Sequence, residues 1–311
     1  MVLGASGGTG RAVVDELLRQ GQDVRAVVRS ARDLPAGVET VAATSSTPSR
    51  LGAPSPARRS CTTPHSPRTT SGARQLARLN DSVARAAGPR GARLVFADNL
   101  YIYGPGASPM TELPAGRHRS EGEPSPRPGG RPPRAPRAGR GGGGARPVVG
   151  LLRAARAELG LGERLFGAAV AGKAASWGGA LDQPHSTSYL PDLARAMVVL
   201  GDRDEAAGRA WHLPVMDPVT GREFGERLFA VLGRSGKLQP TTGLLLLVGG
   251  LFMPIAREAR VVHYQWQAPW ISDWSAFEAA FGPFERTPLD EAIRTTAAWW
   301  AEQARAGEKA A

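Results

Sequence analysis

The apolar positions at the start of the chain have the spacing of a strand, a helix and a second strand in succession. A short apolar run at residues 2–3 is followed by residues 11–20, where four apolar side chains share one helical face. Apolar side chains then recur at every second position of residues 24–28, as they do in a strand. Gly21 indicates the end of the helix, because glycine is favoured just past a helix C-terminus. The unit has the length of a right-handed parallel crossover and predicts a parallel sheet.

Similar patterns return after two interruptions. Strands are expected at residues 38–43 and 92–97, and helices at residues 79–87, 161–170, 273–281 and 288–300. Thr220 and Glu223 have the spacing of a capping box, so another helix should begin there. These elements predict an α/β fold with a doubly wound parallel sheet and a smaller, mostly helical C-terminal lobe.

The most apolar stretch of the chain, residues 240–256, is expected to form a core helix. Its longest apolar run is about a dozen residues long and is interrupted by Gly249, Gly250 and Pro254, so it is too short and too broken to span a bilayer. The alternative is a patch that faces lipid or a protein partner.

Two blocks, residues 44–90 and 114–157, differ from the rest of the chain in composition. They carry net charges of +7 and +8, so the other 220 residues account for −4 of the total of +11. They also hold 14 of the 26 prolines and only eight large apolar or aromatic side chains. Burial of so few apolar groups cannot offset the entropy of ordering the chain. We therefore expect residues 44–78 and 114–157 to be unstructured and to supply no strand to the sheet.

Two explanations of these blocks remain open. The chain has 36 arginines and only three lysines, which favours out-of-frame translation of a GC-rich gene. The other explanation is a pair of genuine basic insertions that bind nucleic acid or another polyanion. The blocks lack the interleaved aromatic side chains that stack on bases, so nucleic acid is the less favoured partner.

A glycine-rich turn at residues 4–10 joins the first strand to the first helix. Such a turn lets a pyrophosphate approach backbone N–H groups and the helix N-terminus, because no Cβ stands in the way. Gly4 is expected to allow the tight turn, Gly7 the approach of the phosphates, and Gly10 the close packing of the helix. A strand, a glycine turn and a helix in this order are typical of a dinucleotide-binding loop. Only three residues precede Gly4, so we interpret the chain as beginning inside the first strand.

The G-x-x-G-x-x-G spacing of this turn resembles the short-chain dehydrogenase/reductase superfamily, especially its NAD-dependent epimerase/dehydratase branch. Further matching segments are an apolar strand followed by Tyr-Gly, a Tyr-x-x-Asp segment entering a helix and a late strand, at residues 93–105, 185–196 and 211–214. The resemblance covers residues 1–43, 79–113 and 159–301. It implies a Rossmann-type NAD(P)-binding domain over residues 1–158, with the remainder of that domain and a substrate lobe over residues 159–311.

The residue after the second strand bears on the choice of cofactor. An NAD-preferring site usually carries an acidic residue there for the ribose hydroxyls, whereas this chain has Arg29. Arg29 and Arg32 could both bind a 2′-phosphate, which favours NADP over NAD; the alternative is that both are solvated loop side chains. The predicted cofactor-binding residues are Gly4, Ser6, Gly7, Gly8, Thr9, Gly10, Arg29 and Arg32.

Asn99 occupies the position at which the family carries its catalytic Ser or Thr. It could hydrogen-bond a substrate carbonyl or the cofactor ribose, or it could merely satisfy a backbone group at the strand end. Tyr103 and Tyr189 are candidates for substrate contact, although Tyr103 in the family is usually a structural or site-wall residue. Asp192 is first of all expected to be a helix N-cap. His185 has no metal-ligand spacing around it, so neither a catalytic role nor a metal site is expected.

Family members that interconvert a carbonyl and an alcohol generally use a Tyr-x-x-x-Lys pair, in which the lysine lowers the tyrosine pKa. None of the four tyrosines of this chain precedes a lysine by four residues. We therefore expect a small-molecule substrate, such as a nucleotide sugar or another carbonyl or hydroxyl compound, but little or no turnover. The alternative is a cofactor-sensing protein that is not an enzyme.

The cysteine content and the N-terminal pattern of the sequence bear on the cellular compartment of the protein. No segment has the pattern of a signal peptide, and no membrane partner is expected. Cys61 is the only cysteine, so an intrachain disulfide is not possible, and a reducing cytoplasm is the natural compartment. The sequence does not indicate an oligomeric state.

Overall fold

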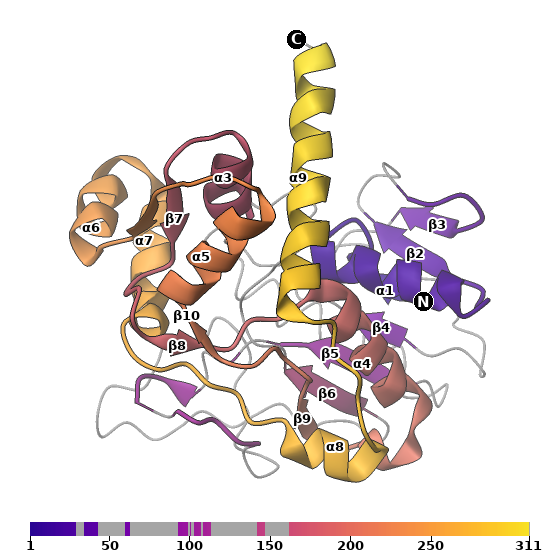
Figure 1. Ribbon diagram of the computed structural model, residues 1–311. Coiled ribbons are helices and arrows are strands. Elements are labelled where there is room, and N and C mark those ends of the chain that lie inside the picture. Colours follow the sequence, from indigo (N-terminus) through magenta and orange to yellow (C-terminus); the bar gives the residue numbers. More distant parts are fainter. Residues whose placement is uncertain are drawn as a thin grey trace.

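The computed structural model describes residues 1–28, 34–42, 60–62, 93–98, 100, 103–106, 108–112, 142–146 and 162–310. Over these residues the chain forms one large sheet, two two-stranded sheets and a series of helices that lie mostly in the second half of the sequence. The large sheet and the helical lobe can be followed in Figure 1.

The large sheet has seven strands in the order β3-β2-β1-β4-β5-β6-β9, and each neighbouring pair is parallel. The chain moves outward from β1 to β3, then crosses to the other side of β1 and continues from β4 to β9. This reversal at β1 defines a doubly wound sheet and confirms the predicted fold class. The strands are β1 (Val2–Leu3), β2 (Arg25–Val28), β3 (Glu39–Ala42), β4 (Ser60–Thr62), β5 (Leu94–Ala97), β6 (Gly142–Arg146) and β9 (Ala210–His212).

Two strands of this sheet lie inside the arginine- and proline-rich blocks, so the expectation that the blocks supply no strand is wrong. β4 pairs with β1 and β5, and β6 pairs with β5 and β9. A strand between two neighbours is defined by backbone hydrogen bonds, which glycine and polar residues also make. The sheet is therefore continuous rather than incomplete. The other residues of both blocks, and the helix expected at 79–87, lie outside the described residues.

The first helix, α1 (Gly8–Arg19), follows β1 directly and packs against α4 (Leu190–Asp202). Both helices bury apolar faces in a core shared with the valines and alanines of the sheet. α1 ends as predicted, because Gly21 adopts a φ of 70° and its N–H donates to the Leu18 carbonyl oxygen at 2.9 Å. This packing holds the glycine turn against the end of the sheet.

A second core lies in the lobe, where Phe224 contacts the rings of Phe166 and Trp177 and all three are fully buried. The predicted capping box of Thr220 and Glu223 is present at the start of α5. Besides α1 and α4, the described elements outside the large sheet are η4 (Gly162–Gly167), α3 (Ala168–Val170), β7 (Ala175–Trp177), β8 (Pro184–His185), η5 (Asp204–Ala206), β10 (Val219–Thr220), α5 (Gly221–Val231), β11 (Leu238–Pro240), α6 (Gly243–Phe252), α7 (Pro254–Val262), η6 (His263–Trp266), α8 (Ser275–Phe281) and α9 (Leu289–Ala310).

The apolar stretch 240–256 does not form the core helix that was expected. It supplies the end of β11, all of α6 and the start of α7, and α6 buries only Leu246 and Gly250. In the described part of the chain, every exposed large apolar side chain lies at residues 244–261. The expectation failed because a helix that is apolar on all sides is usually enclosed, whereas α6 packs mainly against α7. No helix of the described residues is long and apolar enough to cross a membrane.

Candidate functional site

The glycine turn has the geometry that its three spaced glycines predict. Gly4 adopts a φ of 69°, in the left-handed region, and its N–H donates to the Val27 carbonyl oxygen at 3.0 Å. The Gly4 carbonyl oxygen accepts a hydrogen bond from the Gly7 N–H at 2.9 Å. A Cβ at Gly10 would lie 2.2 Å from that same oxygen, so a side chain does not fit there without a shift of the backbone. The N-terminus of α1 is thereby brought close to the end of β1.

The first turn of α1 is accessible and carries no acidic side chain. Gly4, Ser6 and Gly7 are exposed, and Gly8 and Thr9 are half-buried. No side chain of the described residues caps the helix at Gly7. The first N–H groups of a helix and the positive end of its dipole favour an anion at such a position. The residues present therefore fit a diphosphate group.

The turn also lies where the order of the sheet reverses. Open α/β sheets bind ligands in the crevice at the carboxyl ends of the strands beside such a reversal. Because the strands are parallel, the residues that follow β5 and β9 lie at the same edge of the sheet as Gly4. At the usual strand spacing, β5 and β9 are roughly 10 Å and 19 Å from β1. An extended ligand could therefore run from the glycine turn across the end of β5.

A series of hydrogen bonds lies at this edge beyond β5 and β9, and we call it the Tyr103–His212 network. The Tyr103 hydroxyl donates to the Thr111 carbonyl oxygen at 2.7 Å and lies 2.6 Å from Nε2 of His212. Nδ1 of the fully buried His212 lies 3.0 Å from the Ser272 hydroxyl. Since the single Tyr103 proton goes to a carbonyl that can only accept, neutral His212 is assigned as the Nε2–H tautomer, with Nδ1 accepting from Ser272. The network fixes the orientation of the Tyr103 ring.

The other candidates just before and within α4 lie in the interior. His185 is stacked on Trp266 with ring centroids 4.0 Å apart, and burial lowers the pKa of His185 to about 3. Tyr189 is buried in the lobe core, and its contact with a substrate stays a prediction. Asp192 is not the N-cap that was expected, because it lies inside α4 and its carboxylate instead accepts hydrogen bonds from Thr287.

Three predicted site residues, Arg29, Arg32 and Asn99, lie outside the described residues. Arg29 follows the last residue of β2 directly, and Asn99 comes two residues after the end of β5. Their contacts with a cofactor or substrate stay predictions.

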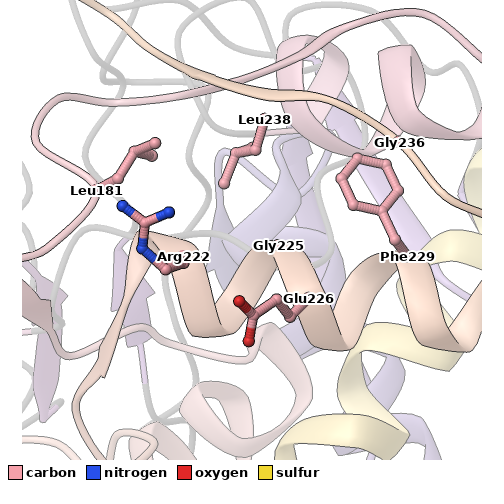
Figure 2. Close-up of a pocket in the computed structure, with 7 residues that line it drawn as sticks. All are labelled: Leu181, Arg222, Gly225, Glu226, Phe229, Gly236 and Leu238. Atoms are coloured by element: carbon pink, nitrogen blue, oxygen red, sulfur yellow. The ribbon is translucent and has the colours of Figure 1, made fainter.

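A cavity of about 200 Å³ lies in the lobe, between α5 and the segment that leads into β11 (Figure 2). Two of its lining glycines have no room for a Cβ, because Gly225 lies directly against Leu238 and Gly236 against Phe229. Ligand pockets usually enclose roughly 300 Å³ or more, so this cavity is too small for a dinucleotide. It does not include the glycine turn.

The sheet, its glycine turn and the helical lobe together define a fold of the dinucleotide-binding, doubly wound class. Solved structures share it over almost the whole length of both chains. Among them are the Bordetella bronchiseptica enzyme WbmH in complex with NAD+ (17% identity, TM-score 0.65, 97% of each chain), the UDP-N-acetylglucosamine 4-epimerase from Bacillus cereus (12%, 0.65, 96% of this chain and 98% of the other) and MoeE5 in complex with UDP-glucose and NAD (18%, 0.65, 98% of each chain). The predicted resemblance to epimerases and dehydratases is confirmed at the level of the fold. No protein-family profile matches the sequence, and no curated protein matches it.

His212 is the site residue that the sequence interpretation missed. It lies at the end of an apolar strand, at the edge of the sheet where ligands bind in this class of fold. A polar residue at that position was the available signal. Its partners Tyr103 and Ser272 are 109 and 60 residues away in the chain, so only the fold could identify them.

Proposed function

We propose that this protein binds a nicotinamide dinucleotide across the turn at residues 4–10 and acts in the manner of an epimerase or dehydratase if it is catalytically active. The observation that carries the proposal is the exposed, uncapped N-terminus of α1 at the reversal point of the sheet. The similar structures of WbmH and MoeE5 support it, because both are complexes with this type of cofactor. When bound, the cofactor would accept or supply a hydride.

The preferred cofactor is NADP rather than NAD. Arg29 and Arg32 follow β2 in the chain, where their positive charges would bind a 2′-phosphate, and Arg29 occupies the position at which an NAD-preferring site usually carries an acidic residue. The substrate is a small carbonyl or hydroxyl compound, with a nucleotide sugar as the first class to test. Asn99 is the candidate for contact with the reacting group, and Tyr103 and Tyr189 are the candidates for the wall of the substrate site. Cys61, as the only cysteine, favours a reducing cytoplasm as the setting.

The direct test is a titration of the full chain with NADPH and NADH, followed by cofactor fluorescence. Gly7→Ala is the informative variant, because Gly7 has φ −81° and ψ 162°, which any residue adopts, and a Cβ would lie no closer than 3.3 Å to the Gly4 carbonyl oxygen. The fold should therefore survive, while the added methyl group stands where the phosphates approach. We expect binding to weaken by about tenfold or more, as the loss of one good hydrogen bond would.

Gly243→Ala is the matched control, since it adds the same methyl group at the first residue of α6, where the nearest atom, Nδ1 of His263, would lie 3.9 Å from the Cβ. NADPH should bind to this control as it does to the unchanged chain. Equal binding by Gly7→Ala, or tighter binding of NADH than of NADPH by the unchanged chain, would contradict the proposed site or the proposed cofactor. Purified protein with NADPH and a panel of aldehydes, ketones and nucleotide sugars should show little or no turnover.

A further inference from the structure

The helical hairpin of α6 and α7, residues 243–262, concentrates the exposed apolar surface of the described chain. Phe252, Leu251 and Leu244 are 82%, 74% and 70% exposed, and Val261 on α7 is 74% exposed. Figure 1 shows α6 at the outer end of the lobe, on the side away from α1. Monomeric proteins that are surrounded only by water rarely expose a contiguous patch of this kind.

The exposed side of α6 is apolar over a single broad arc. At about 100° per residue, residues 244, 245, 247, 248, 251 and 252 fall within an arc of about 160°, and all six are exposed leucine, valine or phenylalanine. Leu246 and Gly250, on the opposite side, are the buried residues of the helix. The arc contains no side-chain hydrogen-bond donor or acceptor.

The charged residues of the hairpin lie on α7 and are mainly basic. Residues 243–262 contain Arg257, Arg260 and one acidic residue, Glu258, and so carry a net charge of +1. A Cβ at Gly250 would lie 2.9 Å from Cγ of Arg257, so the aliphatic part of Arg257 lies against α6 while the residue remains exposed. Arg260, one turn further along α7, is also exposed. An arginine placed in this way can keep its charge in a polar layer while its stem follows apolar surface.

We propose that the α6–α7 hairpin docks on the surface of an anionic lipid bilayer, with α6 in the interface and Arg257 and Arg260 at the level of the headgroups. An interfacial helix of this kind buries its apolar side to a depth of roughly 5–10 Å without crossing the membrane. This surface is separate from the glycine turn, so the proposal does not depend on the proposed function. It departs from the sequence-based expectation that the protein has no membrane partner.

Two other occupants fit the surface less well. A second copy of the chain in a two-fold contact would place the same patch against itself, and would bring the like charges of Arg257 and Arg260 of the two copies closer together. A soluble protein partner usually makes about one hydrogen bond per 100–200 Å² of interface, and the arc of α6 offers no side chain for any. A lipid interior requires no hydrogen bonds from α6, because the helical backbone satisfies its own groups.

The test is co-sedimentation of the full chain with phosphatidylcholine vesicles that contain or lack phosphatidylglycerol, at low and high salt. The variant is Leu251→Asp with Phe252→Asp, and the matched control is Thr295→Asp with Ala298→Asp, which adds two carboxylates at exposed positions of α9. We expect the first variant to lower partitioning into anionic vesicles by about a hundredfold, because two large apolar side chains no longer enter the interface. The control should bind as the unchanged chain does. The basic blocks are identical in all three proteins, so their attraction to anionic lipid does not distinguish them.

A second measurement does not depend on the folding of the aspartate variant. Because Cys61 is the only cysteine, Cys61→Ser with Leu251→Cys carries one environment-sensitive fluorophore on α6, and Cys61→Ser with Ala298→Cys carries it on α9. Anionic vesicles should shift the emission of the first label to the blue and leave the second unchanged. Equal vesicle binding by the aspartate variant and its control, or no shift at position 251, would overturn the proposal. A dimer in vesicle-free solution that is lost in the aspartate variant, without vesicle binding, would assign the surface to a second copy.

Discussion

Asp192 gives the sharpest structural prediction, because its buried carboxylate joins α4 to the segment that precedes α9. One carboxylate oxygen accepts a hydrogen bond from the Thr287 backbone N–H at 2.8 Å. The other accepts from the Thr287 hydroxyl at 2.8 Å and from the Arg195 guanidinium at 2.7 Å. Asp192 is 3% exposed, so little water competes for these contacts. We expect the Asp192→Ala substitution to loosen the attachment of this segment.

The expected loss of stability depends on whether each hydrogen-bond donor can find another acceptor. Hydrogen bonds to a charged group contribute about 1.5–3 kcal/mol each, but donors that can find another partner recover part of that energy. Arg195 is one-third exposed and also donates to the Glu285 carbonyl oxygen at 2.7 Å, so it loses little. The two Thr287 groups are half-buried and account for most of the effect. We therefore expect Asp192→Ala to lower the free energy of unfolding by about 3 kcal/mol. Asp192→Asn, which keeps one oxygen acceptor, should lose about half as much.

Urea unfolding at neutral pH measures this loss as a lower midpoint at an unchanged slope. Thr287→Val is the matched partner variant, because it removes the hydroxyl and keeps the backbone N–H. It should cost about 1 kcal/mol alone, and much less in the Asp192→Ala background, since the acceptor is already absent. A loss below about 1 kcal/mol for Asp192→Ala, or strictly additive losses in the double variant, would refute this account of the contact.

Two further predictions concern the glycine turn and the buried histidine. Gly10→Ala should destabilise the fold by about 1–3 kcal/mol, because its Cβ would overlap the Gly4 carbonyl oxygen, and an unchanged melting temperature would contradict the geometry of the turn. Burial lowers the pKa of His185 to about 3 in the folded chain, whereas its value in the unfolded chain is near 6.5. The contribution of the neutral ring to the free energy of unfolding is therefore fully present above pH 6.5. It is lost as the pH falls toward 3, because the unfolded chain then takes up a proton that the folded chain does not. The loss should approach about 1.4 kcal/mol per pH unit in urea unfolding, and His185→Phe, which keeps a flat ring against Trp266, should remove most of this dependence. A cation–π contact between charged His185 and Trp266 would offset about 1–2 kcal/mol of this loss, which is less than the cost of burying the charged ring.

The first strand-helix-strand unit could be predicted almost completely because its signals are local. The glycine at position 21 ends α1 one residue after its cap, and the three glycines of the turn occupy the positions that the backbone geometry requires. The capping box of α5 was predictable for the same reason, since both of its hydrogen bonds join residues three positions apart. Local patterns of this kind do not depend on the rest of the fold.

The features that could not be predicted depend on contacts between distant residues. β6 has the sequence Gly-Gly-Gly-Ala-Arg, which has no apolar alternation, and it is a strand because β5 and β9 pair with it on both sides. Asp192 has the residue type and position of an N-cap, but its hydrogen bonds to Thr287 span 95 residues. The run of leucines in α6 predicted burial, but no element of the described chain covers its outer side. In each case the structure was determined by contacts with residues distant in the chain, or by their absence, rather than by the local sequence pattern.

The expectation of little turnover gains a structural reason from the tyrosines themselves. A phenol that exchanges a proton during hydride transfer needs a lowered pKa and a free path to the substrate. Among the described tyrosines, Tyr103 follows β5 at the edge that carries the glycine turn, and its hydroxyl already donates its one proton to the Thr111 carbonyl oxygen. Burial raises the pKa of Tyr264, and Tyr189 lies in the lobe core. Lys173 and Lys237 are exposed on the lobe, and neither follows a tyrosine at the spacing of the family pair. Among the residues that the structure describes, the glycine turn is therefore better suited to bind a cofactor than a tyrosine is to exchange a proton.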